Sequence, residues 1–125
     1  MAPTSFAMIQ EPGLTVSATR HGDALRVVIV GTVEARDPGA LLDPYWSELD
    51  QTVRREGIGQ VELDVSGLDF MNSAGLLTLV RWVMKVRAEP GYQLVLRHDE
   101  NVTWQKTNVP VLAKLAPSVV RLAAT

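Results

Sequence analysis

The chain has 125 residues, of which 46% are hydrophobic and 21% are charged, so it has the length and composition of one domain that buries its own core. It contains no cysteine, which excludes disulfides and cysteine-ligated zinc and favours the cytoplasm over an oxidising compartment. The net charge is only −2, and arginine and lysine are scattered along the chain, so the basic surface of a nucleic-acid-binding protein is missing. No apolar run is long enough to insert into a membrane.

The first twelve residues, MAPTSFAMIQEP, come before the first strand pattern. They lack the charged start and the apolar centre of a secretion signal. We therefore expect residues 1–12 to be a flexible lead-in segment and residues 13–125 to form the domain.

Two strands are predicted next, at residues 14–19 and 24–33. Gly22 and Asp23 between them suit a tight turn, so the two strands should pair antiparallel. The second run, ALRVVIVGTV, places apolar residues on both faces, which predicts a central strand that is covered on both sides.

A first helix is predicted to begin with Asp43 as its N-cap and Pro44 in the first helical position, and to end at Gly57. Acidic residues at 48 and 50 precede basic residues at 54 and 55 in the order that the helix dipole favours, so these charges are expected on the helix surface. The apolar positions recur at helical spacing and should face the core: Leu42, Tyr45, Trp46, Leu49 and Val53.

The alternating run QVELDV at residues 60–65 predicts a further strand, after which SGLDFMN turns the chain into a second helix from about Ser73 to Arg87. Trp82 falls opposite the core stripe of this helix and is expected either to pack under a loop or to contact a partner. The stripe itself consists of Leu76, Leu79, Val80, Val83 and Val86.

The remaining sequence predicts a strand at residues 92–98, an irregular helix within 103–116 that is interrupted at Pro110, and a last strand within 118–124. The predicted order is therefore β-β-α-β-α-β-α-β. This order is typical of a single α/β domain with a mixed, mostly parallel sheet of about five strands and helices packed on it.

Ser73, at the turn from strand to helix, is a candidate nucleophile. The letters MNSAG match only half of the nucleophile elbow G-x-S-x-G, because Met71 replaces the first glycine. The candidate bases, His21 and His98, fall in a predicted turn and at a strand end, and a triad would also need an orienting acid at the same end of the sheet. We therefore expect no enzyme and no catalytic residues.

Carboxylates flank the same turn, at Asp64 and Asp69, and follow the next strand, at Asp99 and Glu100. Open α/β sheets bind ligands where their parallel strands end. Aspartates in such loops nevertheless usually bond to turn amides. Since no metal-binding or nucleotide-binding motif is present, we expect no metal ion and no cofactor.

Two further interpretations of Ser73 depend on its place at a helix start. Either Asn72 or Ser73 could cap the second helix. A phosphate on Ser73 would instead face free backbone amides and the positive end of the helix dipole. At about 100° per residue, Leu77 and Met84 fall nearly in line with Ser73 and Arg81 borders them, so this apolar row either widens the core face or contacts a partner.

The stretch VELDVSGLDFMNSAGLLTLVRWVMK, residues 61–85, resembles the STAS domain of bacterial anti-sigma factor antagonists. In that family an aspartate-bearing strand and a short turn lead into Asp-Ser-Ser/Thr-Gly-Leu at the start of a helix. Here Asn72 stands in the place of the aspartate, and Ala74 replaces the second hydroxyl residue. Ser73 is therefore the remaining hydroxyl residue of this turn.

The resemblance implies a non-enzymatic, protein-binding STAS-like domain that acts in signal transduction and transcription regulation. It makes Ser73 the phosphorylation site for a partner that is both a serine kinase and an anti-sigma factor, with a cognate phosphatase to reset the switch. The alternative is a constitutive STAS scaffold or accessory subunit of a transporter or signalling assembly, in which Ser73 is not phosphorylated. The partner-binding residues implied are Asn72, Ser73, Ala74, Leu77, Arg81 and Met84, with Leu76 and Val80 where they are not buried.

Overall fold

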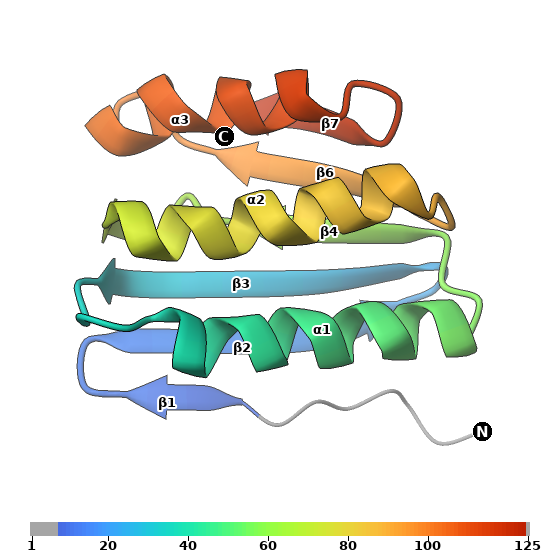
Figure 1. The fold of residues 1–125 in the computed structure, drawn as a ribbon, viewed down its shortest axis with the longest axis horizontal. Helices are drawn as coiled ribbons and strands as arrows, with labels where there is room; N and C mark the ends of the chain where they lie inside the picture. The colour runs from blue at the N-terminus through green and yellow to red at the C-terminus, as the bar shows by residue number, and fades with distance from the viewer. Residues whose placement is uncertain (1–7, 125) are drawn as a thin grey trace.

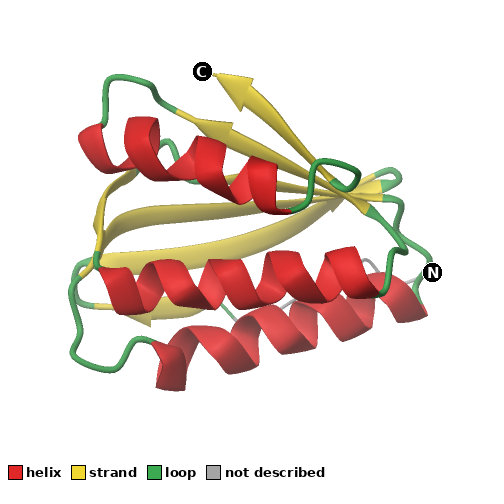
Figure 2. Ribbon diagram, turned by 45° about the horizontal axis from the view of Figure 1, so that its top comes forward, coloured by secondary structure: helices red, strands yellow, loops and turns green. Residues whose placement is uncertain are grey.

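A computed structural model describes residues 8–124 of the chain, in which seven strands form one sheet and helices α1, α2 and α3 lie along one of its faces (Figure 1, Figure 2). The strands run in the order β1-β2-β3-β4-β6-β7, and β5 pairs with the end of β3. The helices are α1 (Gly39–Arg55), α2 (Ser73–Ala88) and α3 (Thr103–Leu115). The strands are β1 (Ile9–Glu11), β2 (Leu14–His21), β3 (Ala24–Val33), β4 (Gln60–Asp64), β5 (Leu68–Met71), β6 (Gln93–His98) and β7 (Val120–Ala124).

The topology explains why the helices share a face. β2 and β3 pair antiparallel through a turn with Gly22 at a φ of 60°, whereas β3, β4, β6 and β7 are parallel neighbours added in one direction. A right-handed crossover between parallel strands places its helix on a fixed side, so successive crossovers in one direction stack their helices together. The predicted mixed, mostly parallel sheet and the predicted hairpin are confirmed.

Two strands were not predicted. Residues 9–11 belong to the segment that we expected to be flexible, but they form β1, and Ile9 is buried opposite Val16. Residues 1–7 of that segment lie outside the described residues. β5 lies inside the predicted turn, where it pairs with the end of β3 beyond the last residue of β4. Both strands satisfy backbone groups of longer neighbours, which single-sequence periodicity does not reveal.

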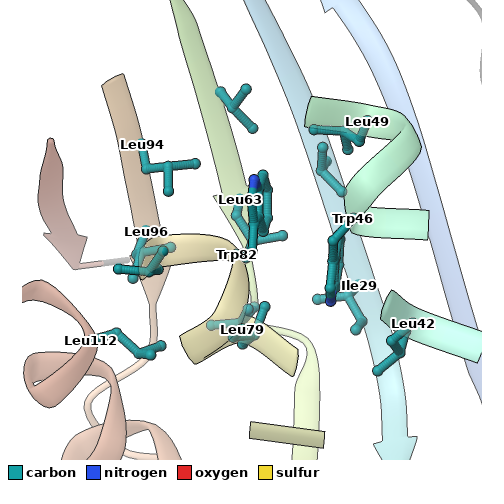
Figure 3. Packing of buried hydrophobic residues seen from close by; sticks show 14 of the residues in the cluster. Ile29, Leu42, Trp46, Leu49, Leu63, Leu79, Trp82, Leu94, Leu96 and Leu112 are labelled. Atoms are coloured by element: carbon teal, nitrogen blue, oxygen red, sulfur yellow. The ribbon is translucent and has the colours of Figure 1, made fainter. Parts of the chain in front are cut away.

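The prediction that β3 is covered on both faces was wrong. Val27 and Ile29 point toward the helices and are buried, as Figure 3 shows for Ile29, whereas Val30 on the opposite face is 47% exposed. Within residues 8–124 the helices occupy one face of the sheet, and no element covers the other face of β3. Its apolar run therefore does not indicate two covered faces.

Two helices pass through a proline. α1 begins four residues before the predicted cap, because the N–H groups of Leu41 and Leu42 bond to the Pro38 carbonyl, and Pro44 therefore lies inside the helix. α3 is continuous through Pro110, where an interruption was predicted. Each proline removes one backbone hydrogen bond, but buried apolar residues on both sides hold the helix together.

The residues predicted to face the core from α1 are buried, and so is Trp82, which packs against α1 rather than under a loop or on a partner. The rings of Trp46 and Trp82 stack with centroids 5.0 Å apart (Figure 3). The Trp82 indole N–H donates to the Tyr92 hydroxyl (2.9 Å), and that hydroxyl donates to Asp50 (2.6 Å). Burial and the neighbouring Asp50 carboxylate raise the pKa of Tyr92 far above its ordinary value.

The charged series in the sequence had suggested that Asp50 lies on the helix surface. Asp50 is instead buried and only 1% exposed. Its carboxylate pairs with Arg54 one turn later and with Lys85 on α2. A buried charge needs such partners, and together these contacts fix α1, α2 and the start of β6 relative to one another.

Candidate functional site

The Ser73 turn lies at the edge of the sheet where the parallel strands end and the helices begin (Figure 1). Of the two predicted capping residues, Asn72 is the cap: its side-chain oxygen accepts a hydrogen bond from the Gly75 N–H at 2.8 Å. The extended backbone of Asn72, with ψ of 170°, is typical of an N-cap. The predicted start of the second helix is confirmed.

Asn72 also holds the turn to the loop between β3 and α1. Its backbone N–H donates to the Val33 carbonyl and its side-chain NH2 donates to the Ala35 carbonyl, both at 2.9 Å. An aspartate could accept the cap bond but could not donate to Ala35. The sequence left the cap to either Asn72 or Ser73, and the bond to Ala35 depends on a residue 37 positions away.

The hydroxyl of Ser73 is free. Ser73 is the first residue of α2 and is exposed, and within residues 8–124 its hydroxyl has no hydrogen-bond partner. The first N–H groups of a helix have no partner inside it, and they carry the positive end of the helix dipole. The hydroxyl is thus accessible to another protein and lies where a negative charge would be stabilised.

On the C-terminal side of Ser73, α2 presents an exposed apolar row that consists of Leu77 and Met84. Leu77 is 52% exposed and Met84 is 37% exposed, so they do not widen the core face. Leu76 and Val80 are half-buried and pack against the core, while Ala74 beside the serine is half-buried. The remaining stripe residues, Leu79, Val83 and Val86, are buried as predicted.

Arg81 borders this row and is held by α1. Its guanidinium bonds to both carboxylate oxygens of Asp43, at 2.7 and 3.2 Å. Asp43 is therefore an ion-pair partner inside α1 and not the predicted N-cap. Because this pair is exposed, we attribute little stability to it, but it fixes where Arg81 stands beside Leu77.

The aspartates at the strand ends mostly serve their own turns. Asp64 accepts from the N–H of Ser66 (2.9 Å) and from its hydroxyl (2.6 Å), and pairs with Arg26 (3.1 Å). Burial alone would raise the pKa of Asp64, but these hydrogen bonds and the arginine outweigh it and hold the pKa below its usual range. Asp99 accepts from the Asn101 N–H. Among the described residues no cluster of side chains could hold a metal ion.

Two other side chains fix this edge of the sheet and were not singled out from the sequence. The Trp104 indole N–H donates to the Leu68 carbonyl at 2.6 Å, and the buried Gln105 amide donates to the carbonyls of Val65 and Leu68. These bonds join the start of α3 to the turn before β5. A glutamine at the start of a helix gives no sequence signal of such a role.

In the described part of the chain, neither His21 nor His98 is hydrogen-bonded to Ser73 as a catalytic base would be. His21 is exposed at the end of β2, beside the hairpin turn, while His98 is buried at the end of β6. Within residues 8–124, the Ser73 hydroxyl bonds to neither of them. The geometry offers no activated nucleophile of the Ser-His kind.

Comparison with known proteins supplies the fold. No protein-family model and no curated protein matches the sequence. Among solved structures, an anti-sigma factor antagonist from Mycobacterium paratuberculosis superimposes with a TM-score of 0.61 and 21% sequence identity, over 94% of this chain and 92% of that chain. This chain has a STAS-like fold.

The likeness to that structure covers 94% of this chain, and within residues 8–124 β1 and β7 form the two edges of the sheet. In this chain Ser73 is the first residue of α2, as the motif in the sequence predicted. None of the helices in residues 8–124 of this STAS-like domain is long and apolar enough to cross a membrane.

Proposed function

We propose that this STAS-like domain is a non-enzymatic regulatory module that binds a protein partner and is switched by phosphorylation of Ser73. The partner is a serine kinase that is also an anti-sigma factor, and a cognate phosphatase reverses the modification, so the module regulates transcription from the cytoplasm. Likeness to the fold of an anti-sigma factor antagonist supports this proposal. The proposed binding surface consists of Asn72, Ser73, Ala74, Leu77, Arg81 and Met84.

The observation that carries the proposal is the free hydroxyl of Ser73. Asn72 caps α2, so the structure has no need of the Ser73 side chain. An exposed apolar row that includes Leu77 starts one turn below it. A hydroxyl without a structural role, next to apolar side chains without a covering element, is what a modifiable binding surface requires.

The switch would act through charge. Transfer of the terminal phosphoryl group of ATP to the Ser73 oxygen releases ADP and the hydroxyl proton, and leaves about 1.5 to 2 negative charges at the helix start. The free amides of the first turn and the helix dipole stabilise these charges, so α2 stays folded. The partner, however, would have to bury a phosphate beside Leu77, which weakens its binding.

The constitutive scaffold is the second candidate, and the Asn72 side chain favours it. Where the family motif has an aspartate next to the acceptor, this chain uses an amide that bonds to the Ala35 carbonyl. The turn is then built for rigidity, and Ser73 is an ordinary exposed residue. On this interpretation, Ser73→Ala and Ser73→Asp bind the partner equally well.

The test combines modification with binding. Intact-mass analysis and fragment mapping of the protein from its own cells, in several growth states, should find about 80 Da on Ser73 in some states and not in others. Affinity capture with the unmodified chain then supplies the partner. Ser73→Asp should bind it at least about tenfold more weakly than Ser73→Ala. Ser118→Asp, in the exposed turn between α3 and β7, is the matched control and should bind normally.

Two results would contradict the proposed switch. The first is an unmodified Ser73 peptide in every growth state at full coverage. The second is equal partner binding by the alanine and aspartate variants at position 73. Either result favours the constitutive scaffold.

A further inference from the structure

A cavity of about 450 Å³ lies between the β1–β2 turn, the end of β3 and the first turn of α1. These segments lie at the same edge of the sheet as the start of α2, where Ser73 stands (Figure 1). Its volume falls within the usual range for small-molecule sites. Its position also fits, because open α/β sheets bind ligands beyond the carboxyl ends of their parallel strands. None of the residues proposed to bind the protein partner lines it.

The inner wall of the cavity is apolar. Leu14 from β2 and Val33 from β3 are buried in the core, and so is Leu42 from α1. Leu41 adds a half-buried side chain from the first turn of α1. A ligand that fills this space therefore needs an apolar body.

Three carboxylates also line the cavity: Glu11 at the end of β1, and Glu34 and Asp37 in the loop that follows β3. All three residues are exposed, and no ion pair involves them within residues 8–124. Among residues 8–124, those that line the cavity include no lysine, arginine or histidine. Like charges gathered around a concave, partly apolar site concentrate a field of one sign, which attracts the opposite charge.

We propose that this cavity binds a small organic cation, a primary amine or guanidinium compound with an apolar body. The body packs against Leu14, Leu41 and Leu42, and the cationic group stands among Glu11, Glu34 and Asp37. An anion would meet the three carboxylates and is disfavoured, although the cavity touches the N-terminus of α1. A neutral ligand of the same shape gains only the apolar contacts.

The Asn72 side chain connects this cavity to the Ser73 turn in space. Val33 and Ala35 both line the cavity: the Asn72 side-chain NH2 donates to the Ala35 carbonyl, and the Asn72 backbone N–H donates to the Val33 carbonyl. The proposed site is therefore a neighbour of the proposed switch and does not depend on it. Binding of a small cation is measured on the isolated chain, so the proposal stands or falls without the protein partner.

The test compares three probes with one aromatic body: phenethylammonium, 2-phenylethanol and 3-phenylpropanoate. Each is titrated into the full-length, isotope-labelled chain and followed by amide chemical shifts in two-dimensional NMR. We expect the cation to shift the amides of Leu14 and Leu41 with a Kd near 1 mM, and to bind about tenfold more tightly than the alcohol, a difference of about 1.4 kcal/mol. The carboxylate should bind more weakly than the alcohol.

The matched variants are Glu11→Gln/Glu34→Gln/Asp37→Asn and a control, Glu89→Gln, at the other end of α2. The triple variant should bind the cation no more tightly than the alcohol while its Kd for the alcohol is unchanged, which shows that the cavity itself remains intact. The control should behave like the natural chain. The proposal is overturned if cation and alcohol bind equally well, if the carboxylate binds best, or if no probe shifts the cavity amides at about 20 mM.

Discussion

Substituting Asn72 tests whether one side chain holds both the start of α2 and the loop before α1. In Asn72→Ala the cap on the Gly75 N–H is lost, which costs about 0.5 to 2 kcal/mol. The bond to the Ala35 carbonyl is lost as well, which costs about another 0.5 to 1.5 kcal/mol. We therefore expect the free energy of unfolding to fall by about 1 to 3.5 kcal/mol.

Asn72→Asp separates the two roles. The carboxylate keeps the cap and gains about 0.3 to 1 kcal/mol from the helix dipole. It has no proton to donate, however, and so places an oxygen against the Ala35 carbonyl where the amide stood at 2.9 Å. The net loss of stability should therefore be below about 1.5 kcal/mol, smaller than for the alanine variant.

The assay is urea denaturation followed by the fluorescence of the buried Trp46 and Trp82, together with amide hydrogen exchange measured by mass spectrometry. Both variants should exchange faster in residues 34–42, and only Asn72→Ala should exchange faster in residues 73–79. Ser73→Ala is the control and should change stability by less than about 0.5 kcal/mol, because that hydroxyl has no partner. If Ser73→Ala costs as much as Asn72→Ala, the cap is wrongly assigned. If exchange in residues 34–42 is unchanged in both variants, the bond to Ala35 does not hold the loop.

Three further predictions concern single residues. Tyr92→Phe should lower the free energy of unfolding by about 1 to 3 kcal/mol in urea, because Asp50 and the Trp82 N–H each lose a buried hydrogen-bond partner; a change below about 0.5 kcal/mol would contradict that account. The pKa of Asp64 is lowered in the folded state, so the stability that its carboxylate contributes is present above the unfolded pKa of about 3.9 and is lost as the pH falls through the folded pKa. Urea titrations between about pH 2 and 6 should therefore show a smaller acid-induced loss of stability in Asp64→Asn than in the natural chain. Equal losses would refute this account of Asp64. Leu77→Ser should leave stability within about 0.5 kcal/mol, since the side chain is half exposed, yet weaken partner binding at least about tenfold in calorimetry; normal binding would remove Leu77 from the surface.

Several features set by short stretches of sequence were predicted correctly, although the helix start predicted at Asp43 was not. The hairpin turn at Gly22, the alternating strand before the Ser73 turn and the start of α2 each depend on neighbouring residues, so their patterns are visible in the letters. The motif around Ser73 likewise predicted a STAS-like domain, which the structural likeness bears out. The role of Ser73 as a phosphorylated switch stays a prediction.

Tertiary structure decided what depends on residues far apart in the chain. β1 and β5 exist because longer strands offer them unpaired backbone, and α1 and α3 continue through prolines because apolar residues on both sides are buried. The position of Trp82 likewise depends on its stacking against Trp46 of α1, which is distant in the sequence.

The same division applies to the site. The sequence by itself determined that a capping residue and a serine stand together at a helix start, because capping is a contact within one turn. Only the packed structure decided that Asn72 is the cap and bonds to Ala35, that Ser73 and Leu77 stay exposed, and that three carboxylates gather around an apolar cavity. Such contacts join loops that the crossovers of the sheet bring to one edge, and no local pattern records which loops will meet.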